Sequence, residues 1–171
     1  NYSDHIAGEK ILNNNNNFVR NADGSAKKIH LIRPVQPDLV DSIVAAPSSI
    51  AAGQPMTVVY RITNNGEGIT YPGPWQNDLR LSEDFFANPN DGDRLLATRT
   101  RQAALPPGGS YLDTVTVTIP SWTPAGNYIL IGRANSNSGI TEFSTGNNLG
   151  FHLLEVYRPD STDLIVNEIT A

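Results

Sequence analysis

Cysteine is absent from this chain of 171 residues, and charged residues make up only 17% of it. The absence of cysteine excludes disulfide bonds, a thiolate nucleophile and cysteine-ligated metal. The formal net charge is −5, and Lys27-Lys28 is the only adjacent pair of basic residues. Because nucleic acid is a polyanion, this charge argues against a nucleic-acid partner. The longest apolar stretches have the length of strands, so we expect no direct insertion into a membrane.

The sequence begins at Asn1, and Met56 is its one methionine. We interpret it as a fragment of a longer protein, so the lack of a targeting segment does not locate the parent. Asn, Ser, Thr, Gly and Pro take the place of the missing charged residues. These residues disfavour helix interiors and are common in turns, so the composition predicts short strands joined by many turns.

Two segments of the sequence occur twice in the same order. Asp38-Leu39-Val40 recurs as Asp163-Leu164-Ile165, and Ile29-His30-Leu31-Ile32 recurs as Phe151-His152-Leu153-Leu154. An Arg-Pro pair follows the second segment both times, at residues 33–34 and 158–159. Such self-similarity is typical of tandem repeats. We therefore expect the tail of a preceding repeat with an Asn-rich loop at 1–36, one complete repeat at 37–157, and a linker with the first strand of a following repeat at 158–171.

The complete repeat shows the alternation of a β-sheet protein. Met56, Val58, Tyr60 and Ile62 share one face of a predicted strand. Turn residues such as those at 106–109 separate the strands, and no segment has a helical period. The predicted strands are 39–45, 56–63, 75–82, 95–100, 111–119, 127–133 and 150–157. About seven short strands of this kind predict an all-β fold, an immunoglobulin-like Greek-key β-sandwich flanked by partial repeats.

The complete repeat also carries an ordered set of short motifs. They are Pro37-Asp38-Leu39-Val40, Ala52-Gly53-Gln54-Pro55, residues 59–66, residues 75–82, Asp91-Gly92-Asp93, Leu105-Pro106-Pro107-Gly108, residues 124–128, Ile140-Thr141-Glu142 and Gly146-Asn147-Asn148. This set resembles the CARDB family, the cell-adhesion-related domain found in bacteria. The chain departs from the family where Asn135 replaces a frequent Asp and Thr145 replaces a frequent Glu. No role that needs negative charge at those two positions is expected here.

The resemblance implies an immunoglobulin-like or fibronectin-III-like module, repeated in tandem in large exported proteins. It implies a non-catalytic structural or adhesive role outside the cell, on a bacterial surface or in a secreted protein. The partners would be neighbouring repeats of the same chain, with a cell-surface protein or a glycan as adhesive targets. Asn147 and Asn148 would have structural roles. The alternatives are a ligand-binding module for calcium or carbohydrate and an accessory domain of a secreted hydrolase, because a fold alone does not supply a ligand.

Two aromatic residues are expected to have structural roles. Tyr128 follows Gly126-Asn127 at the start of a predicted strand, where a tyrosine corner sends its hydroxyl back to a nearby backbone group. Trp75 shares a strand face with Leu79 and Leu81, so we expect its ring in the core.

The polar loop at 83–93 holds the candidate metal ligands Asp84, Asn90, Asp91 and Asp93. Calcium prefers clustered carboxylate and carbonyl oxygens from a flexible loop. The spacing does not match an EF-hand. Capping of turns by Asp and Asn is the competing interpretation. Asp38, Asp160 and Asp163, near the module joints, are alternative ligands.

Two further aromatic residues are candidates for contact with a carbohydrate ligand. Trp122 lies near a turn, between Ser121 and Thr123, and Tyr71 lies in a loop rich in proline. The competing interpretation is that these rings pack inward or are isolated surface aromatics.

No arrangement of residues predicts an enzyme. The Gly-x-Ser-x-Gly elbow, the phosphate-binding loop and paired metal-binding histidines are all absent from the sequence. His30 and His152 occupy equivalent places in successive repeats, which is a feature of strand patterning rather than of catalysis. We therefore expect a non-catalytic protein that needs no cofactor, with calcium as the one candidate.

Overall fold

The computed structural model describes residues 34–159, except for residues 72, 89 and 91. This described part of the chain contains eight strands and no helix. The strands are β1 (Leu39–Ala45), β2 (Ser49–Ala51), β3 (Pro55–Asn64), β4 (Trp75–Ser82), β5 (Arg94–Arg101), β6 (Ser110–Thr118), β7 (Gly126–Arg133) and β8 (Leu149–Tyr157). Among these residues, no helix is long and apolar enough to cross a membrane. Residues 1–33 and 160–171, with most of the two predicted partial repeats, lie outside the described residues.

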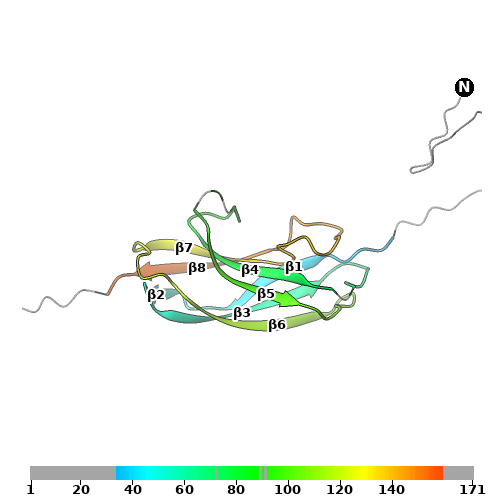
Figure 1. The fold of residues 1–171 in the computed structure, drawn as a ribbon, viewed down its shortest axis with the longest axis horizontal. Coiled ribbons are helices and arrows are strands. Elements are labelled where there is room, and N and C mark those ends of the chain that lie inside the picture. Colours follow the sequence, from blue (N-terminus) through cyan, green and yellow to red (C-terminus); the bar gives the residue numbers. More distant parts are fainter. Residues whose placement is uncertain (1–33, 72, 89, 91, 160–171) are drawn as a thin grey trace, which may run out of the picture. The chain divides into compact units, whose positions relative to one another are not determined.

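The strands form two sheets that pack face to face (Figure 1). One sheet has the order β1-β3-β6 and the other has the order β2-β8-β7-β4-β5. Paired strands are antiparallel, apart from the parallel pair of β2 and β8. The chain crosses between the sheets from β1 to β2, from β2 to β3, from β3 to β4, from β5 to β6 and from β6 to β7. The predicted all-β, immunoglobulin-like sandwich is therefore confirmed.

All seven predicted strands are present, each within one residue of its predicted ends. The strand that the sequence did not predict is β2, which has only three residues and pairs with β8 at the edge of the larger sheet. Three residues are too few to show a period of two, and Pro47 and Gly53 on either side indicated a turn. The sandwich consequently has eight strands rather than the predicted seven.

Alternating side chains from both sheets fill the core. Every second residue of β3 from Met56 to Ile62 is buried, and so is every second residue of β4 from Trp75 to Leu81. Burying an aliphatic or aromatic side chain of this size stabilises a fold by about 1.5–3 kcal/mol. The alternation predicted for these two strands is confirmed.

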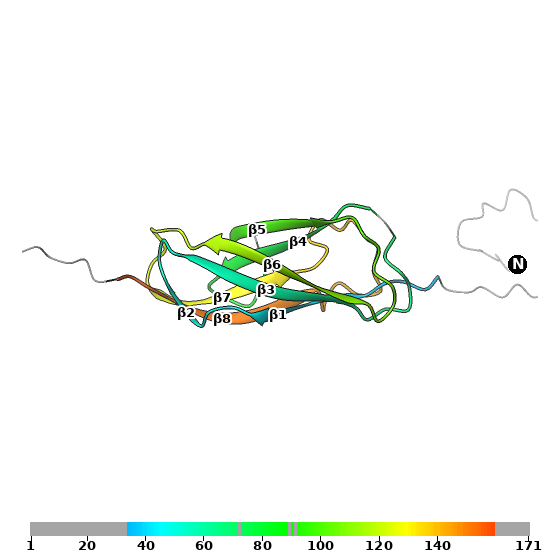
Figure 2. The same ribbon diagram turned by 90° about the horizontal axis from the view of Figure 1, so that it is seen from below.

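The chain enters and leaves the sandwich at opposite ends. Leu39 at the start of β1 pairs with Asn64 at the end of β3, whereas Tyr157 at the end of β8 pairs with Ala51 of β2. Figures 1 and 2 both show the residues before β1 at one end of the domain and the residues after β8 at the other.

Candidate functional site

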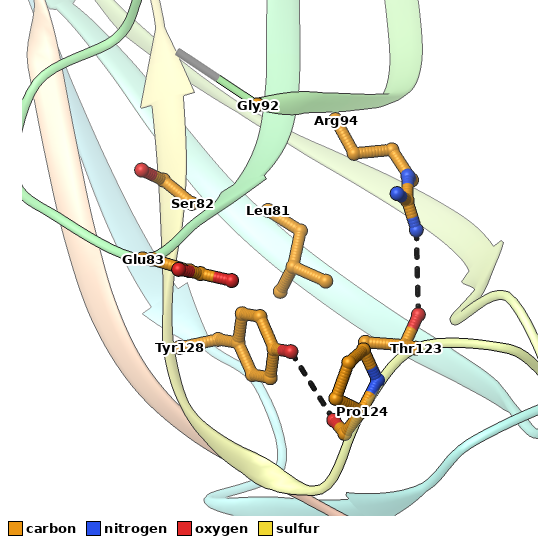
Figure 3. Close-up of a pocket in the computed structure, with 8 residues that line it drawn as sticks. All are labelled: Leu81, Ser82, Glu83, Gly92, Arg94, Thr123, Pro124 and Tyr128. Carbon is orange, nitrogen blue, oxygen red and sulfur yellow. Dashed lines mark hydrogen bonds between the residues drawn. The ribbon is translucent and has the colours of Figure 1, made fainter.

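A hollow lies between the loop that follows β4 and the turn that precedes β7 (Figure 3). It is lined by Leu81, Ser82, Glu83, Gly92, Arg94, Thr123, Pro124 and Tyr128. The Tyr128 hydroxyl donates a hydrogen bond to the Pro124 carbonyl oxygen at 3.2 Å, which is the contact of a tyrosine corner. Arg94 donates to the Thr123 hydroxyl at 3.4 Å. These bonds fix the turn before β7 to its own strand and to β5.

The acidic loop uses its side chains to cap its own turns. Asp84 Oδ1 accepts a hydrogen bond from the Phe86 amide at 2.8 Å, and Asp93 Oδ2 accepts one from the Asn88 amide at 2.7 Å. The Asn90 amide donates to Asn88 Oδ1 at 3.0 Å. This is the capping that Asp and Asn provide in turns.

Asp84 and Asp93 also line one shallow hollow together with Glu83. Among the described residues, however, no three carboxylate or histidine side chains lie close enough to hold a metal ion. Asp91, the remaining carboxylate among the candidate ligands, lies outside the described residues. Calcium in this loop stays a prediction.

The two candidate carbohydrate contacts lie at opposite ends of the domain. Trp122 follows β6 and Tyr71 follows β3, and these two strands pair antiparallel from Pro55 opposite Thr118 to Thr63 opposite Ser110. Trp122 is 62% exposed and Tyr71 is 79% exposed. The Arg94 guanidinium carbon lies 3.5 Å from the centroid of a Trp122 ring, so it covers one face of the indole in a cation–π contact. The structure does not bring the two aromatics into one site.

Glu142 is the centre of a polar network at the end where the chain enters. Its Oε2 accepts a hydrogen bond from the Leu39 amide at 2.6 Å, and its Oε1 accepts from Asn135 Nδ2 at 2.6 Å and Asn148 Nδ2 at 2.8 Å. Burial raises the pKa of Glu142, while the three hydrogen bonds oppose that rise. The network joins the start of β1 to the segment between β7 and β8.

The two asparagines before β8 complete this network. Asn148 also donates to the Ala134 carbonyl oxygen at 3.2 Å, beyond the end of β7. Asn147 Nδ2 donates to both carboxylate oxygens of Asp38, at 3.1 and 3.0 Å. These contacts join Asn147 to the residue before β1, and Asn148 to the segment between β7 and β8.

Asp41 of β1 is a buried carboxylate that sequence analysis missed. Asp41 is 3% exposed, and neither of its carboxylate oxygens has a hydrogen-bond partner in the described part of the chain. Burial raises the pKa of Asp41 to about 8. A Cβ at Gly132 or Gly150 would lie 2.7 or 2.9 Å from an Asp41 oxygen, so only glycine fits at this cross-strand pair. The alternation of Leu39, Asp41 and Ile43 is the signal that could have revealed it.

Known proteins match this chain in structure but not in sequence. No model of a protein family and no curated protein matches the sequence. Among solved structures, the crystal structure of the CARDB domain of a Pyrococcus furiosus protein, in complex with di-metal ions, aligns with a TM-score of 0.53 and 16% identity. That alignment covers 71% of this chain and 90% of the other. This chain has the fold of a CARDB domain.

Two further solved structures bear on the comparison. The solution NMR structure of the same Pyrococcus furiosus domain aligns with a TM-score of 0.51 and 17% identity, over 71% of this chain and 95% of that one. A β-glucosidase from Erythrobacter marinus aligns with a TM-score of 0.48 and 11% identity, over 71% of this chain and 16% of the enzyme. The resemblance to CARDB domains is thus confirmed in the fold, and the likeness to the enzyme carries no functional argument.

Within this CARDB fold, Asn135 suits its surroundings better than the frequent Asp. It adopts a positive φ of 50°, a conformation that asparagine tolerates. Its Nδ2 donates to Glu142 and to the Ile140 carbonyl oxygen, the latter at 2.8 Å. An Asp at this position would lose both donors and bring a second negative charge beside Glu142.

The one histidine among the described residues has a structural contact. His152 Nε2 lies 3.1 Å from the Pro47 carbonyl oxygen, which joins β8 to the segment before β2. A nucleophilic catalyst needs a base within hydrogen-bond distance of a hydroxyl or thiol. His152 forms no such pair, so this CARDB-fold domain lacks a histidine-based catalytic set in the part of the chain that is described.

Proposed function

We propose that this domain is a non-catalytic structural module, one repeat of a tandem array in a large protein outside the bacterial cell. The observation that carries the proposal is the entry and exit of the chain at opposite ends of a sandwich with its own core. Proline fixes a backbone dihedral, so the joints around Pro34, Pro37 and Pro159 limit hinge motion between repeats. An array of such modules holds what it carries at a distance.

The use of the buried polar groups supports a structural role. Glu142 accepts hydrogen bonds from Asn135 and Asn148 in the network at the entry end. Tyr128 fixes the turn at the exit end. The polar groups that the sequence singled out at both ends thus hold the chain where it enters and leaves.

An adhesive role is part of the same proposal. Repeats of one chain multiply weak contacts with a surface protein or a glycan, because each contact raises the effective concentration of the next. Trp122 offers an exposed aromatic ring for such a contact. A role as an accessory domain of a secreted hydrolase differs only in the other domains of the parent protein.

Small-angle X-ray scattering tests the in-line array. Residues 37–161 are duplicated in register within the chain, and the unduplicated 171-residue chain is the control. One added repeat should lengthen the maximum dimension by about 40 Å, because strands of this length span roughly 30 Å and the joint adds the rest. An increase of less than about 15 Å would show that repeats fold back on one another, which contradicts the proposal.

Calcium should have little effect on stability. The Pyrococcus furiosus domain was solved with di-metal ions, whereas among the described residues of this chain no three carboxylate or histidine side chains lie close together. Asp84 and Asp93 already cap backbone amides. We therefore expect Tm to differ by less than about 1 °C between excess EDTA and a calcium concentration of about 100 mM, which is about 100 times a millimolar dissociation constant. A rise of several degrees would contradict this and direct attention to Asp91 and the joint aspartates.

A further inference from the structure

Exposed apolar side chains gather at the end of the sandwich where the chain enters. Four of them are between 44% and 79% exposed: Val35, Ile69, Tyr71 and Phe143. Thr70 is buried, so its neighbours Ile69 and Tyr71 point outward from the loop that follows β3, which Figure 1 shows at this end of the domain. We call these four apolar residues the entry cluster. Isolated apolar residues are common on a surface, whereas a cluster of them marks a place of contact.

Backbone hydrogen bonds bring the segments of the entry cluster together. The Gly68 amide donates to the Gln36 carbonyl oxygen at 2.9 Å, and the Phe143 amide donates to the Pro37 carbonyl oxygen at 2.8 Å. A Cβ at Gly68 would lie 2.6 Å from the Val35 carbonyl oxygen, so the loop after β3 packs directly on the residues that lead into β1. Backbones that are already fixed reduce the entropy that a contact at this surface would cost.

Trp122 presents an exposed ring at the opposite end, where the chain leaves. The Arg94 guanidinium covers one face of its indole, which holds the ring in place. The Arg158 guanidinium donates to the Trp122 carbonyl oxygen at 3.3 Å, and Arg158 directly follows β8. The rest of the indole is open, because Trp122 remains mostly exposed. Trp122 therefore offers a rigid aromatic surface beside the joint to the next repeat.

The joint between repeats is too short to keep these two ends apart. The Arg-Pro pair at 33–34 recurs at 158–159, directly after β8. The carbonyl oxygen of Tyr157, the last residue of β8, accepts a hydrogen bond from the Ala52 amide at 2.8 Å. With the joint of residues 33–36, only Arg, Pro and Val lie between this anchor and the Gln36 anchor of the next repeat. Consecutive Cα atoms are about 3.8 Å apart, so the two anchors are separated by at most about 15 Å.

We propose that the entry cluster of each repeat packs against the Trp122 end of the repeat before it, where the neighbours share this sequence. This contact rests on the proposed tandem array, and it fixes the angle between successive repeats. Tyr71 and Trp122 lie at opposite ends of one repeat, yet an array brings them to the same joint. The Trp122 ring then stays open for an adhesive contact only at the last repeat of an array.

Acrylamide quenching of tryptophan fluorescence tests this contact in a chain that carries residues 35–159 twice in tandem. The duplication rebuilds the joint Arg-Pro-Val-Gln-Pro of residues 33–37, whereas the natural second joint has Asp160 after its proline. Trp75 is buried in the core, so acrylamide reaches mainly Trp122. Trp122→Phe in the second copy leaves the ring at the joint as the reporter. Trp122→Phe in the first copy leaves the ring after the last complete repeat, which is the matched control.

We expect the ring at the joint to be quenched at least about twofold less than the ring at the end, because a packed contact excludes solvent. Ile69→Ser combined with Tyr71→Ser in the second copy should abolish this difference. Leu112→Ser in the second copy removes an exposed leucine from β6 and should leave the difference unchanged. Circular dichroism and the melting temperature check that each variant is folded.

Equal quenching of the two rings overturns the proposal, and so does a difference that survives Ile69→Ser with Tyr71→Ser. Protection that grows with protein concentration also overturns it, because a second molecule would then cover the ring. Small-angle scattering on the same chain separates this contact from the spacer role. A chain that lengthens as expected but shows equal quenching is an array without contacts at its joints. A chain that does not lengthen contradicts the array, and the contact with it.

Discussion

The free energy of unfolding should fall by about 1.4 kcal/mol for each pH unit between about pH 4 and about pH 8. The cause is Asp41, whose pKa burial raises from 3.8 to about 8 in the folded domain. The folded state keeps a proton that the unfolded chain releases above its ordinary pKa. This stabilisation is fully present below the unfolded pKa and is lost as pH rises through the folded pKa. Burial also raises the pKa of Glu142, which acts in the same direction.

The total change is roughly 5 kcal/mol, which is a large part of the 5–15 kcal/mol that stabilises a typical domain. Urea unfolding followed by the fluorescence of the buried Trp75 measures it at about pH 5, 7 and 9. The change Asp41→Asn removes the titrating group and keeps its shape. This variant should match the wild type at the lowest pH, flatten the profile, and exceed the wild type by several kcal/mol at the highest.

The control for this experiment is Glu67→Gln, because Glu67 is an exposed carboxylate on the loop that follows β3. It should reproduce the wild-type profile. If Asp41→Asn keeps the wild-type slope, the buried carboxyl between β1 and the Gly132–Gly150 pair is not what ties stability to pH.

The second large effect should come from Glu142→Ala, which we expect to destabilise the domain by about 3 kcal/mol. The substitution removes the acceptor of three hydrogen bonds, and it leaves the Leu39 amide without its partner. Asn135 and Asn148 each keep a second acceptor, at the Ile140 and Ala134 carbonyl oxygens, which limits the loss. Urea unfolding at neutral pH measures the difference from the wild type.

Two companion variants separate the network from the loss of a side chain. Glu142→Gln keeps one carbonyl acceptor but presents an amide to a donor, so its loss should lie between zero and that of Glu142→Ala. Glu67→Ala removes an exposed glutamate and should change stability by less than about 0.5 kcal/mol. Equal losses in the two alanine variants would contradict the importance of the network.

Local patterns in the sequence were sufficient to predict the strands and the fold. The alternation in β3 and β6 has a period of two over nine or ten residues, which leaves little choice of structure. The three residues of β2 carry no such pattern. Its place is set by hydrogen bonding to the edge of β8, between residues that are far apart in the chain.

The polar sites were also harder to predict, because the groups that meet in them lie far apart in the chain. Leu39 and Glu142 are separated by 103 positions, and nothing local indicates that they meet. Asp84 and Asp93 were proposed as calcium ligands from their chemistry, yet a carboxylate that caps a turn has the same sequence signature as one that binds an ion. The core position of Asp41 could be predicted from alternation in β1, but only its contacts with the opposite sheet show that it lacks a partner.

The in-line arrangement of repeats is tested most directly by a distance between two neighbouring repeats. The chain has no cysteine, so Thr114→Cys in both copies of the duplicated repeat gives two unique sites for spin labels on an exposed strand. Double electron–electron resonance should give one narrow distance distribution near about 40 Å, one module apart. A distribution centred below about 25 Å would mean that neighbouring repeats fold back on each other. That result would contradict a spacer built from modules with joints at opposite ends.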